Sequence, residues 1–284
     1  MRNLLLAVGI ASVLVTMVAT SCSRQADESS PAAPLHTSGK TLSGSPSTSM
    51  QVEPHPVTTE TGQIVDDTDW QPIGLSVQSR PIRARTIGSG PRRVLFVGGI
   101  HGDEPEGAYT TGQLPSAFTA DGLAGLATLT ILEDANPDGR AAGTRGNAHG
   151  VDINRNFPAA NFDAAAPSNG GTPLSQPESR ALVETIDRTA PELVLVAHSW
   201  LGREFVNFDG PARAIAERFA RTAGMPVEES SAFAPTPGSL GSYVGRDRGI
   251  AVVTIEVLRG SDPLHVWDKL RPALLEAIRG AQSS

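Results

Sequence analysis

The chain has 284 residues, of which 39% are hydrophobic and 19% are charged, so it can form a globular domain with a sizeable core. Its formal net charge is -7 and its pI is about 5.4. This balance argues against general affinity for nucleic acid, because phosphate binding depends on clustered lysine and arginine. A small or zwitterionic substrate suits the chain better.

The first 22 residues have the organisation of an export signal. Arg2 precedes an apolar run over residues 4–18, and small residues then lead to Cys22, the only cysteine. This end resembles the lipobox of bacterial lipoproteins, which implies acylation of Cys22 and a lipid-anchored protein of a bacterial cell envelope that faces outside the cytoplasm. Ala19 departs from the pattern, which more often has a larger aliphatic residue there. Without acylation the segment is a plain secretory signal, and the protein is secreted or periplasmic.

Two further regions follow this signal. Residues 23–61 are rich in Ser, Thr, Pro and Ala and predict a disordered tether, because they have too little apolar surface to offset the entropy of ordering. Residues 62–284 predict a single catalytic domain. Short apolar runs alternate there with helix-like stretches, which indicates an α/β fold with a mixed, largely parallel central sheet and helices on both faces.

The elements of this domain are predicted in chain order. A strand at 93–97 precedes a helix at 104–114, and a strand at 127–132 precedes a long loop over 135–172 that is rich in Asn, Gly and Pro. Helices at 177–189, 211–223 and 263–278 alternate with strands at 193–197 and 250–255. Long loops inside compact domains usually carry function.

Three polar residues follow two of the predicted strands. His101 and Glu104 come after the strand at 93–97, and His198 follows the strand at 193–197. Two His and one Glu on separate turns at a sheet edge form a catalytic zinc ligand set with an open fourth position. Taken singly, His101 and Glu104 could belong to a polar turn that caps a helix, and His198 could be a buried, hydrogen-bonded histidine. Together they favour one Zn²⁺ ion per chain.

A fourth polar residue supplies a candidate base. Glu256 follows the nearly all-apolar strand at 250–255, where it can accept a proton from a water that the metal acidifies. The alternative is an ordinary ion pair between Glu256 and Arg259.

The segment 144–158 gathers two arginines with several amide and acid side chains. Because arginine offers a planar fork of donors, this loop predicts a carboxylate or oxyanion site. The alternative is a structural loop held by asparagine turns.

Four motifs together resemble the zinc carboxypeptidase family. They are residues 101–104, 150–158, 198–199 and 254–257, in the order and rough spacing of that family. The resemblance implies that His101, Glu104 and His198 bind zinc and that Glu256 is the general base and acid. It also implies that Arg145 stabilises the oxyanion, that Asn154 and Arg155 hold the substrate carboxylate, and that Asp152 accepts a hydrogen bond from the free ring nitrogen of His101.

Further residues resemble the murein peptide amidases within this family. They lie at 136–139, 150–161 and 236–243. These enzymes cut the γ-D-glutamyl to diaminopimelate bond of peptidoglycan peptides, so the resemblance implies hydrolysis of an amide beside a free carboxylate. The expected partners are a peptide or peptidoglycan fragment and, through the lipid anchor only, a membrane. One departure is that residues 231–235 lack the mobile tyrosine of the digestive enzymes, and Tyr243 lies too close to Glu256 to take its role.

Three alternatives stay open. The same motifs allow a conventional metallocarboxypeptidase that removes C-terminal residues. An aspartoacylase-like deacylase of N-acyl amino acids shares the His-x-x-Glu and Asp-x-Asn-Arg segments, although residues 254–256 favour the carboxypeptidase family. A non-catalytic envelope-binding lipoprotein would be free to lose Glu256, which is present.

Overall fold

The computed structural model describes residues 69–229 and 236–280. The predicted signal, Cys22 and the tether lie outside the described residues, as do residues 231–235. Within the described part, no helix is both long enough and apolar enough to cross a membrane.

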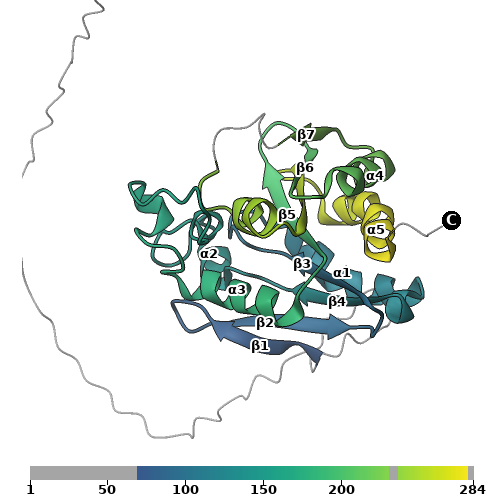
Figure 1. Cartoon of the computed structure of the whole chain (residues 1–284), viewed down its shortest axis with the longest axis horizontal. Coiled ribbons are helices and arrows are strands. Elements are labelled where there is room, and N and C mark those ends of the chain that lie inside the picture. Colours follow the sequence, from purple (N-terminus) through teal and green to yellow (C-terminus); the bar gives the residue numbers. More distant parts are fainter. Residues whose placement is uncertain (1–68, 230–235, 281–284) are drawn as a thin grey trace, which may run out of the picture. The chain divides into compact units, whose positions relative to one another are not determined.

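Eight strands and five α-helices make up this part of the chain (Figure 1). The strands are β1 (Gln71–Leu75), β2 (Pro81–Ile87), β3 (Arg92–Val97), β4 (Ala127–Leu132), β5 (Leu193–Trp200), β6 (Phe205–Asp209), β7 (Val227–Glu229) and β8 (Ala251–Leu258). The α-helices are α1 (Glu106–Ala120), α2 (Pro137–Ala142), α3 (Pro177–Thr189), α4 (Arg213–Ala223) and α5 (Pro263–Arg279), and short helical turns occur at η2 (Leu123–Gly125), η3 (Ile153–Arg155) and η4 (Pro167–Asn169). A π-helix, η6, spans Gly241–Asp247.

All eight strands form one sheet in the order β1-β2-β4-β3-β5-β8-β6-β7. The central strands β4, β3, β5 and β8 run parallel to one another. β2 joins this centre antiparallel on one side and β6 joins it antiparallel on the other. Parallel strands end at the same edge of the sheet, so the loops after β3, β5 and β8 meet there.

Side chains of the central strands alternate between two apolar cores. Val94 and Phe96 of β3 face one core, which α1, α4 and α5 cover. Leu95 and Val97 face the other, which includes residues of α3 and η6. Both faces are therefore covered (Figure 1), which explains the nearly continuous apolar runs of β3 and β5.

The predicted fold class is confirmed, and several elements have the predicted bounds. β4 and α3 begin and end as predicted, whereas β5 and β8 continue to Trp200 and Leu258. The prediction that His198 and Glu256 follow their strands is therefore wrong. Both lie inside the strands, because the backbone ladder between β5 and β8 continues past the apolar residues and pairs His198 with Glu256.

Candidate metal and hydrolase site

Three buried side chains meet at the carboxyl edge of the sheet. His101 and Glu104 lie in the turn between β3 and α1, and His198 lies in β5. His101 Nδ1 is 2.9 Å from Glu104 Oε1, and His198 Nδ1 is 2.9 Å from Glu104 Oε2. One ligand atom from each residue lies within 4.8 Å of the other two.

Two further residues surround this triad. Asp152 Oδ1 lies 3.1 Å from His101 Nε2, so the outer nitrogen of the ring contacts a carboxylate while Nδ1 faces Glu104. Arg145 donates from Nε to Asp152 Oδ2 and from Nη1 to Glu104 Oε1, over 2.9 and 3.2 Å. Asp152 therefore orients both the imidazole and the guanidinium.

The charges of these groups are strongly coupled. Burial alone would raise the pKa of Glu104, but hydrogen bonds from His101 and His198 outweigh it and hold the pKa well below its usual range. Burial would lower the pKa of His101, yet the bonds to Asp152 and Glu104 raise it. Binding of a metal through His101 would therefore displace a proton.

Arg259 approaches the triad from the loop after β8. Its Nη1 donates to Asp103 Oδ2 and its Nη2 to Glu104 Oε1, each over 3.1 Å. The hydrogen bonds of Arg259 therefore go to Asp103 and Glu104, whereas the alternative reading of Glu256 expected Arg259 to pair with Glu256. The backbone N–H of Ser199 also donates to Glu104 Oε2 over 3.1 Å. These donors hold the Glu104 carboxylate in one orientation.

Glu256 stands beside the triad on β8. Burial is the main cause that raises its pKa, to about 7, and the Glu104 carboxylate adds to the rise against the opposing charge of His198. Its Oε2 is buried and has no hydrogen-bond partner among the described residues. A buried acceptor without a protein partner is unusual, and a catalytic role or an ordered water or ion is among the explanations for one.

The donor set of the triad suits a zinc ion. Zinc prefers imidazole nitrogen and carboxylate oxygen in four-coordinate sites, with bond lengths of roughly 2.0–2.2 Å. Each histidine Nδ1 lies 2.9 Å from a different oxygen of Glu104, and one ligand atom from each residue lies within 4.8 Å of the other two, so the three donors are near enough to share one ion. Asp152 and Arg145 occupy the surrounding positions that orient such ligands.

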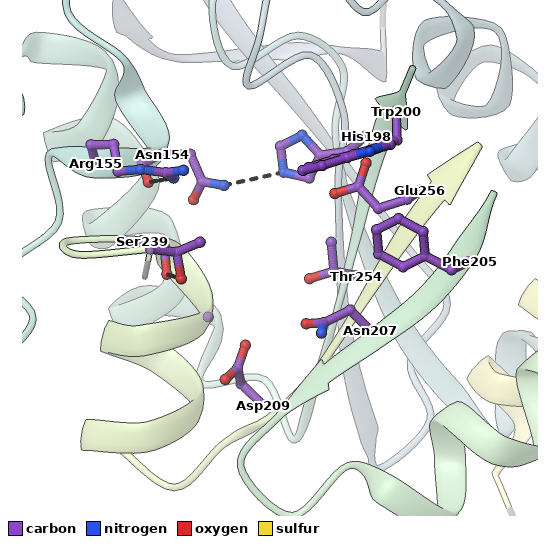
Figure 2. Close-up of a pocket in the computed structure, with 12 residues that line it drawn as sticks. Asn154, Arg155, His198, Trp200, Phe205, Asn207, Asp209, Ser239, Thr254 and Glu256 are labelled. Carbon is purple, nitrogen blue, oxygen red and sulfur yellow. Dashed lines mark hydrogen bonds between the residues drawn. The ribbon is translucent and has the colours of Figure 1, made fainter. Parts of the chain in front are cut away.

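A pocket of about 150 Å³ opens beside Glu256 and His198. Asn154 and Arg155 line one wall, as Figure 2 shows, and Asn154 Nδ2 lies 3.4 Å from His198 Nε2. The backbone N–H of Leu240 donates to Asn154 Oδ1, which directs the amide nitrogen of Asn154 toward the pocket. Arg155 lies close enough to Arg145 for the two charges to interact, and burial with this repulsion lowers its pKa.

The sequence did not indicate the wall across from Asn154 and Arg155, which is lined by Trp200 of β5 and by Phe205, Asn207 and Asp209 of β6. The other lining residues, Thr236, Ser239, Gly241 and Thr254, fall within the segments 236–243 and 254–257 that the sequence singled out. On β6 the residues that line the pocket alternate with Val206 and Phe208, which pack on a core. This period of two was the available signal, although β6 is too short and too polar for it to stand out.

Comparison with protein families shows to which family the chain belongs. A model described as zinc carboxypeptidase matches residues 33–208, more than half of the chain. The chain belongs to the zinc carboxypeptidase family. The match ends before Glu256, so the place of that residue in the site depends on the geometry above. Membership makes the chain a hydrolase with a zinc cofactor, for which His101, Glu104 and His198 can hold one ion.

Individual relatives show which members of the family the chain is similar to in sequence. Murein peptide amidase A of Escherichia coli K12 is 32% identical over 178 residues, which are 57% of this chain and 69% of the relative. Gamma-D-glutamyl-L-diamino acid endopeptidase 1 of Lysinibacillus sphaericus is 24% identical over 253 residues, covering 69% of this chain and 62% of the relative.

Solved structures agree on the fold. The murein-tripeptide amidase of Escherichia coli O157 superposes with a TM-score of 0.61 at 26% identity, covering 76% of this chain and 93% of that chain. Carboxypeptidase A of Helicoverpa armigera superposes with a TM-score of 0.60 at 21% identity, covering 72% of this chain and 64% of that chain. This second likeness shows the fold alone.

Proposed function

We propose that this protein hydrolyses the amide bond between γ-D-glutamate and a diamino acid such as diaminopimelate in peptidoglycan peptides. The observation that carries the proposal is the pocket itself. It is lined by Glu256, Asn154, Arg155 and His198, the last of which belongs to the metal-binding triad, and this arrangement supports Glu256 as the base and Asn154 with Arg155 as a carboxylate clamp. The printed names of the relatives, murein peptide amidase and γ-D-glutamyl-L-diamino acid endopeptidase, support the choice of substrate.

Each residue of the site has a defined part in this reaction. When bound, zinc supplies a Lewis acid that polarises the scissile carbonyl and acidifies the attacking water. Glu256 takes a proton from that water, whose oxygen forms a bond to the carbonyl carbon. Arg145, whose Nε and Nη1 are held by Asp152 and Glu104, presents its guanidinium to the developing oxyanion. The carbon–nitrogen bond then breaks as Glu256 passes the proton to the leaving amine.

The clamp explains why a free carboxylate beside the scissile bond is needed. Arg155 lines the pocket with a planar fork of donors, and Asn154 lies next to it with its amide nitrogen directed inward. A carboxylate held there places the neighbouring amide near Glu256. The terminal diamino acid of a peptidoglycan tripeptide has such a carboxylate, and so does the last residue of an ordinary peptide.

A direct assay tests the substrate. Purified zinc-loaded protein is incubated with L-Ala-γ-D-Glu-diaminopimelate, with peptides that have ordinary α-linked C-terminal residues, and with N-acetyl-aspartate. We expect release of diaminopimelate from the first at a rate well above release of amino acids from the others. Faster cleavage of the α-linked peptides would establish a conventional carboxypeptidase, and preferred cleavage of N-acetyl-aspartate would establish a deacylase.

We further propose that Cys22 is acylated and anchors the protein to the bacterial envelope, on the side away from the cytoplasm. The support is the apolar run over residues 4–18 followed by small residues and a single cysteine. Mass spectrometry of the full chain expressed in a bacterium tests this, because a diacylated N-terminal cysteine has a defined added mass. A protein that begins after residue 22 without lipid would show a plain secretory signal instead.

A further inference from the structure

The clamp of Asn154 and Arg155 contacts a turn, residues 236–242, that leads into η6. Figure 2 shows Ser239 of this turn on the same side of the pocket as the two clamp residues. The backbone N–H of Leu240 donates to Asn154 Oδ1 over 2.9 Å. Because a side-chain amide has one acceptor oxygen and one donor nitrogen, this bond decides which end of Asn154 is offered to a substrate.

The 236–242 turn also packs directly on the backbone of Arg155. Gly238 has a φ of 67°, in the left-handed region, and a Cβ there would lie 2.3 Å from the Arg155 carbonyl oxygen. The Gly238 carbonyl accepts a hydrogen bond of 3.0 Å from the N–H of Phe157. Arg155 Nη1 in turn donates to the Asn154 carbonyl over 2.7 Å. A shift of the turn would therefore move both clamp residues.

Asn161, from the loop between η3 and α3, bonds to the 236–242 turn at two points. Its Oδ1 accepts a hydrogen bond from the N–H of Gly238, and its Nδ2 donates to Ser242 Oγ, each over 3.1 Å. These two points lie on either side of Leu240 in the sequence. The side chain of Asn161 thus holds the stretch of backbone that directs the Leu240 N–H at Asn154.

Ser242 gives this bridge an ordered end. Its side chain is buried, its N–H donates to Ser239 Oγ over 3.0 Å, and its own hydroxyl donates to the Thr236 carbonyl over 3.2 Å. Thr236 and Ser239 both line the pocket. Because Ser242 is already fixed by these contacts, the bond from Asn161 orders few additional groups and costs little entropy.

We propose that Asn161 is a positioning residue for substrate binding. By bridging the 236–242 turn it keeps Asn154 and Arg155 in the orientation that receives the carboxylate beside the scissile bond. This inference rests on the proposed function, which requires such a carboxylate. Asn161 is exposed and is not among the residues that line the pocket, so it acts through the turn. Its effect belongs to the affinity for the carboxylate and not to the breaking of the bond.

Two peptides that differ in one group test this inference. In L-Ala-γ-D-Glu-diaminopimelate the carboxylate beside the scissile amide is free, and in the second peptide it is a carboxamide. Calorimetry with the zinc-loaded Glu256→Gln protein reports binding without turnover. We expect the free acid to bind roughly 10-fold more tightly, because hydrogen bonds to charged groups are the stronger ones. Equal affinities would overturn both the clamp and this inference.

Adding Asn161→Ala to the same protein locates the effect. We expect the affinity for the free acid to fall roughly 10-fold while the affinity for the carboxamide stays unchanged, so that the two peptides bind alike. Discrimination that survives in Asn161→Ala would overturn the inference and leave the proposed function standing. Equal weakening of both peptides would show a general loosening of the site and would also overturn it.

Thr172→Ala is the matched control. It is a neutral change at an exposed position of the same loop, and Thr172 does not line the pocket. We expect this variant to bind both peptides as the Glu256→Gln protein does.

Kinetics with Glu256 present give a second measure. Asn161→Ala should raise KM for the free-acid peptide roughly 10-fold and leave kcat close to the native value, as for contacts made equally in the bound substrate and the transition state. Zinc content and thermal unfolding should stay close to native, because Asn161 is exposed. A fall in kcat without a rise in KM would place Asn161 in the chemical step and overturn the inference.

Discussion

Glu256 is a partly buried carboxyl group that lies beside the triad and lines the pocket. General acid and base catalysis by one positioned side chain contributes roughly 10²–10⁴-fold in rate. We therefore expect Glu256→Gln to lose about that factor in kcat while its zinc content and its thermal unfolding stay close to those of the native protein. Steady-state kinetics, metal analysis and a thermal melt measure these three properties. Glu184→Gln, at an exposed position on α3, is the control. A fully active variant would remove the base assignment.

The pKa of Glu256 predicts the acid side of the pH profile. The group must be deprotonated to accept a proton, so kcat/KM should rise with pH as the carboxyl ionises. Burial raises this pKa from 4.5 to about 7 in the metal-free protein. A cation bound nearby lowers the pKa of Glu256 again. We therefore expect kcat/KM to reach half of its maximum, on the acid side of the profile, at a pH between the ordinary and the raised pKa. A profile that is flat down to pH 4 would contradict this assignment.

Asp152 contacts both His101 and Arg145, so its loss should affect metal binding and catalysis together. Groups that hydrogen-bond to a metal ligand typically contribute about 10–100-fold to affinity or activity. We expect Asp152→Asn to weaken zinc binding by about this factor, measured by competition with a chromogenic chelator. The exposed Asp268→Asn should bind zinc as the native protein does. Native affinity in Asp152→Asn would show that Asp152 does not support the ligand.

At the scale of elements, close backbone contacts place the turn that carries the ligands. Gly102 lies against α2, where a Cβ would collide with the Gly139 carbonyl carbon and the Arg140 nitrogen. Asn136, at the start of α2, also donates to the carbonyls of Ile100 and Arg145 over 3.3 Å each. The turn with His101 and the loop with Arg145 are therefore fixed to the same short helix.

Two alanine substitutions test this packing. Gly102→Ala forces backbone apart in a buried position, and we expect a loss of about 1–3 kcal/mol in the free energy of unfolding. Gly112→Ala in α1 meets nothing within 4 Å and should stabilise the protein by roughly 0.5–1 kcal/mol, because alanine favours helix interiors over glycine. Urea unfolding of the metal-free proteins measures both changes. Equal unfolding midpoints for Gly102→Ala and the native protein would contradict the contact with α2.

The long apolar elements were predictable from the sequence, and the short ones were not. Buried strands such as β4 and the amphipathic helix α3 have patterns that local residues determine. β6 and β7 exist because β8 offers its free edge to Phe205–Asp209 and this strand in turn pairs with Val227–Glu229. Such pairings depend on tertiary partners, which a local pattern does not contain.

The same limit applies to the site. The ligand residues and the base belong to recognisable motifs at the ends of apolar runs, so the sequence predicted that they meet at one edge of the sheet, although His198 and Glu256 lie inside their strands. Asp209 and Asn207 come from β6, and the packing of η6 on Asp209 depends on a π-helix that no local pattern indicated. The residues beside the metal ligands were therefore predictable, whereas the side of the pocket that β6 lines depends on tertiary pairing.

At the scale of the whole molecule, the two apolar cores include none of the metal ligands. Chelation of zinc should abolish hydrolysis while leaving the far-ultraviolet circular dichroism spectrum largely unchanged, because helices and strands are held by these cores. Zinc at 100 times its Kd should add about 2.7 kcal/mol of stability and raise Tm. Glu256→Gln should show the same rise, since Glu256 is not a ligand. Activity that survives complete chelation would contradict the role of the metal.

The register between β5 and β8 pairs His198 directly with Glu256, so interstrand backbone bonds fix the spacing between a metal ligand and the base. On its other side β8 pairs with β6, where Phe205 lies opposite Glu256 and also lines the pocket. One continuous ladder therefore joins the metal ligand, the base and a pocket-lining strand, and a slip of register on either side of β8 would displace the base from its neighbours.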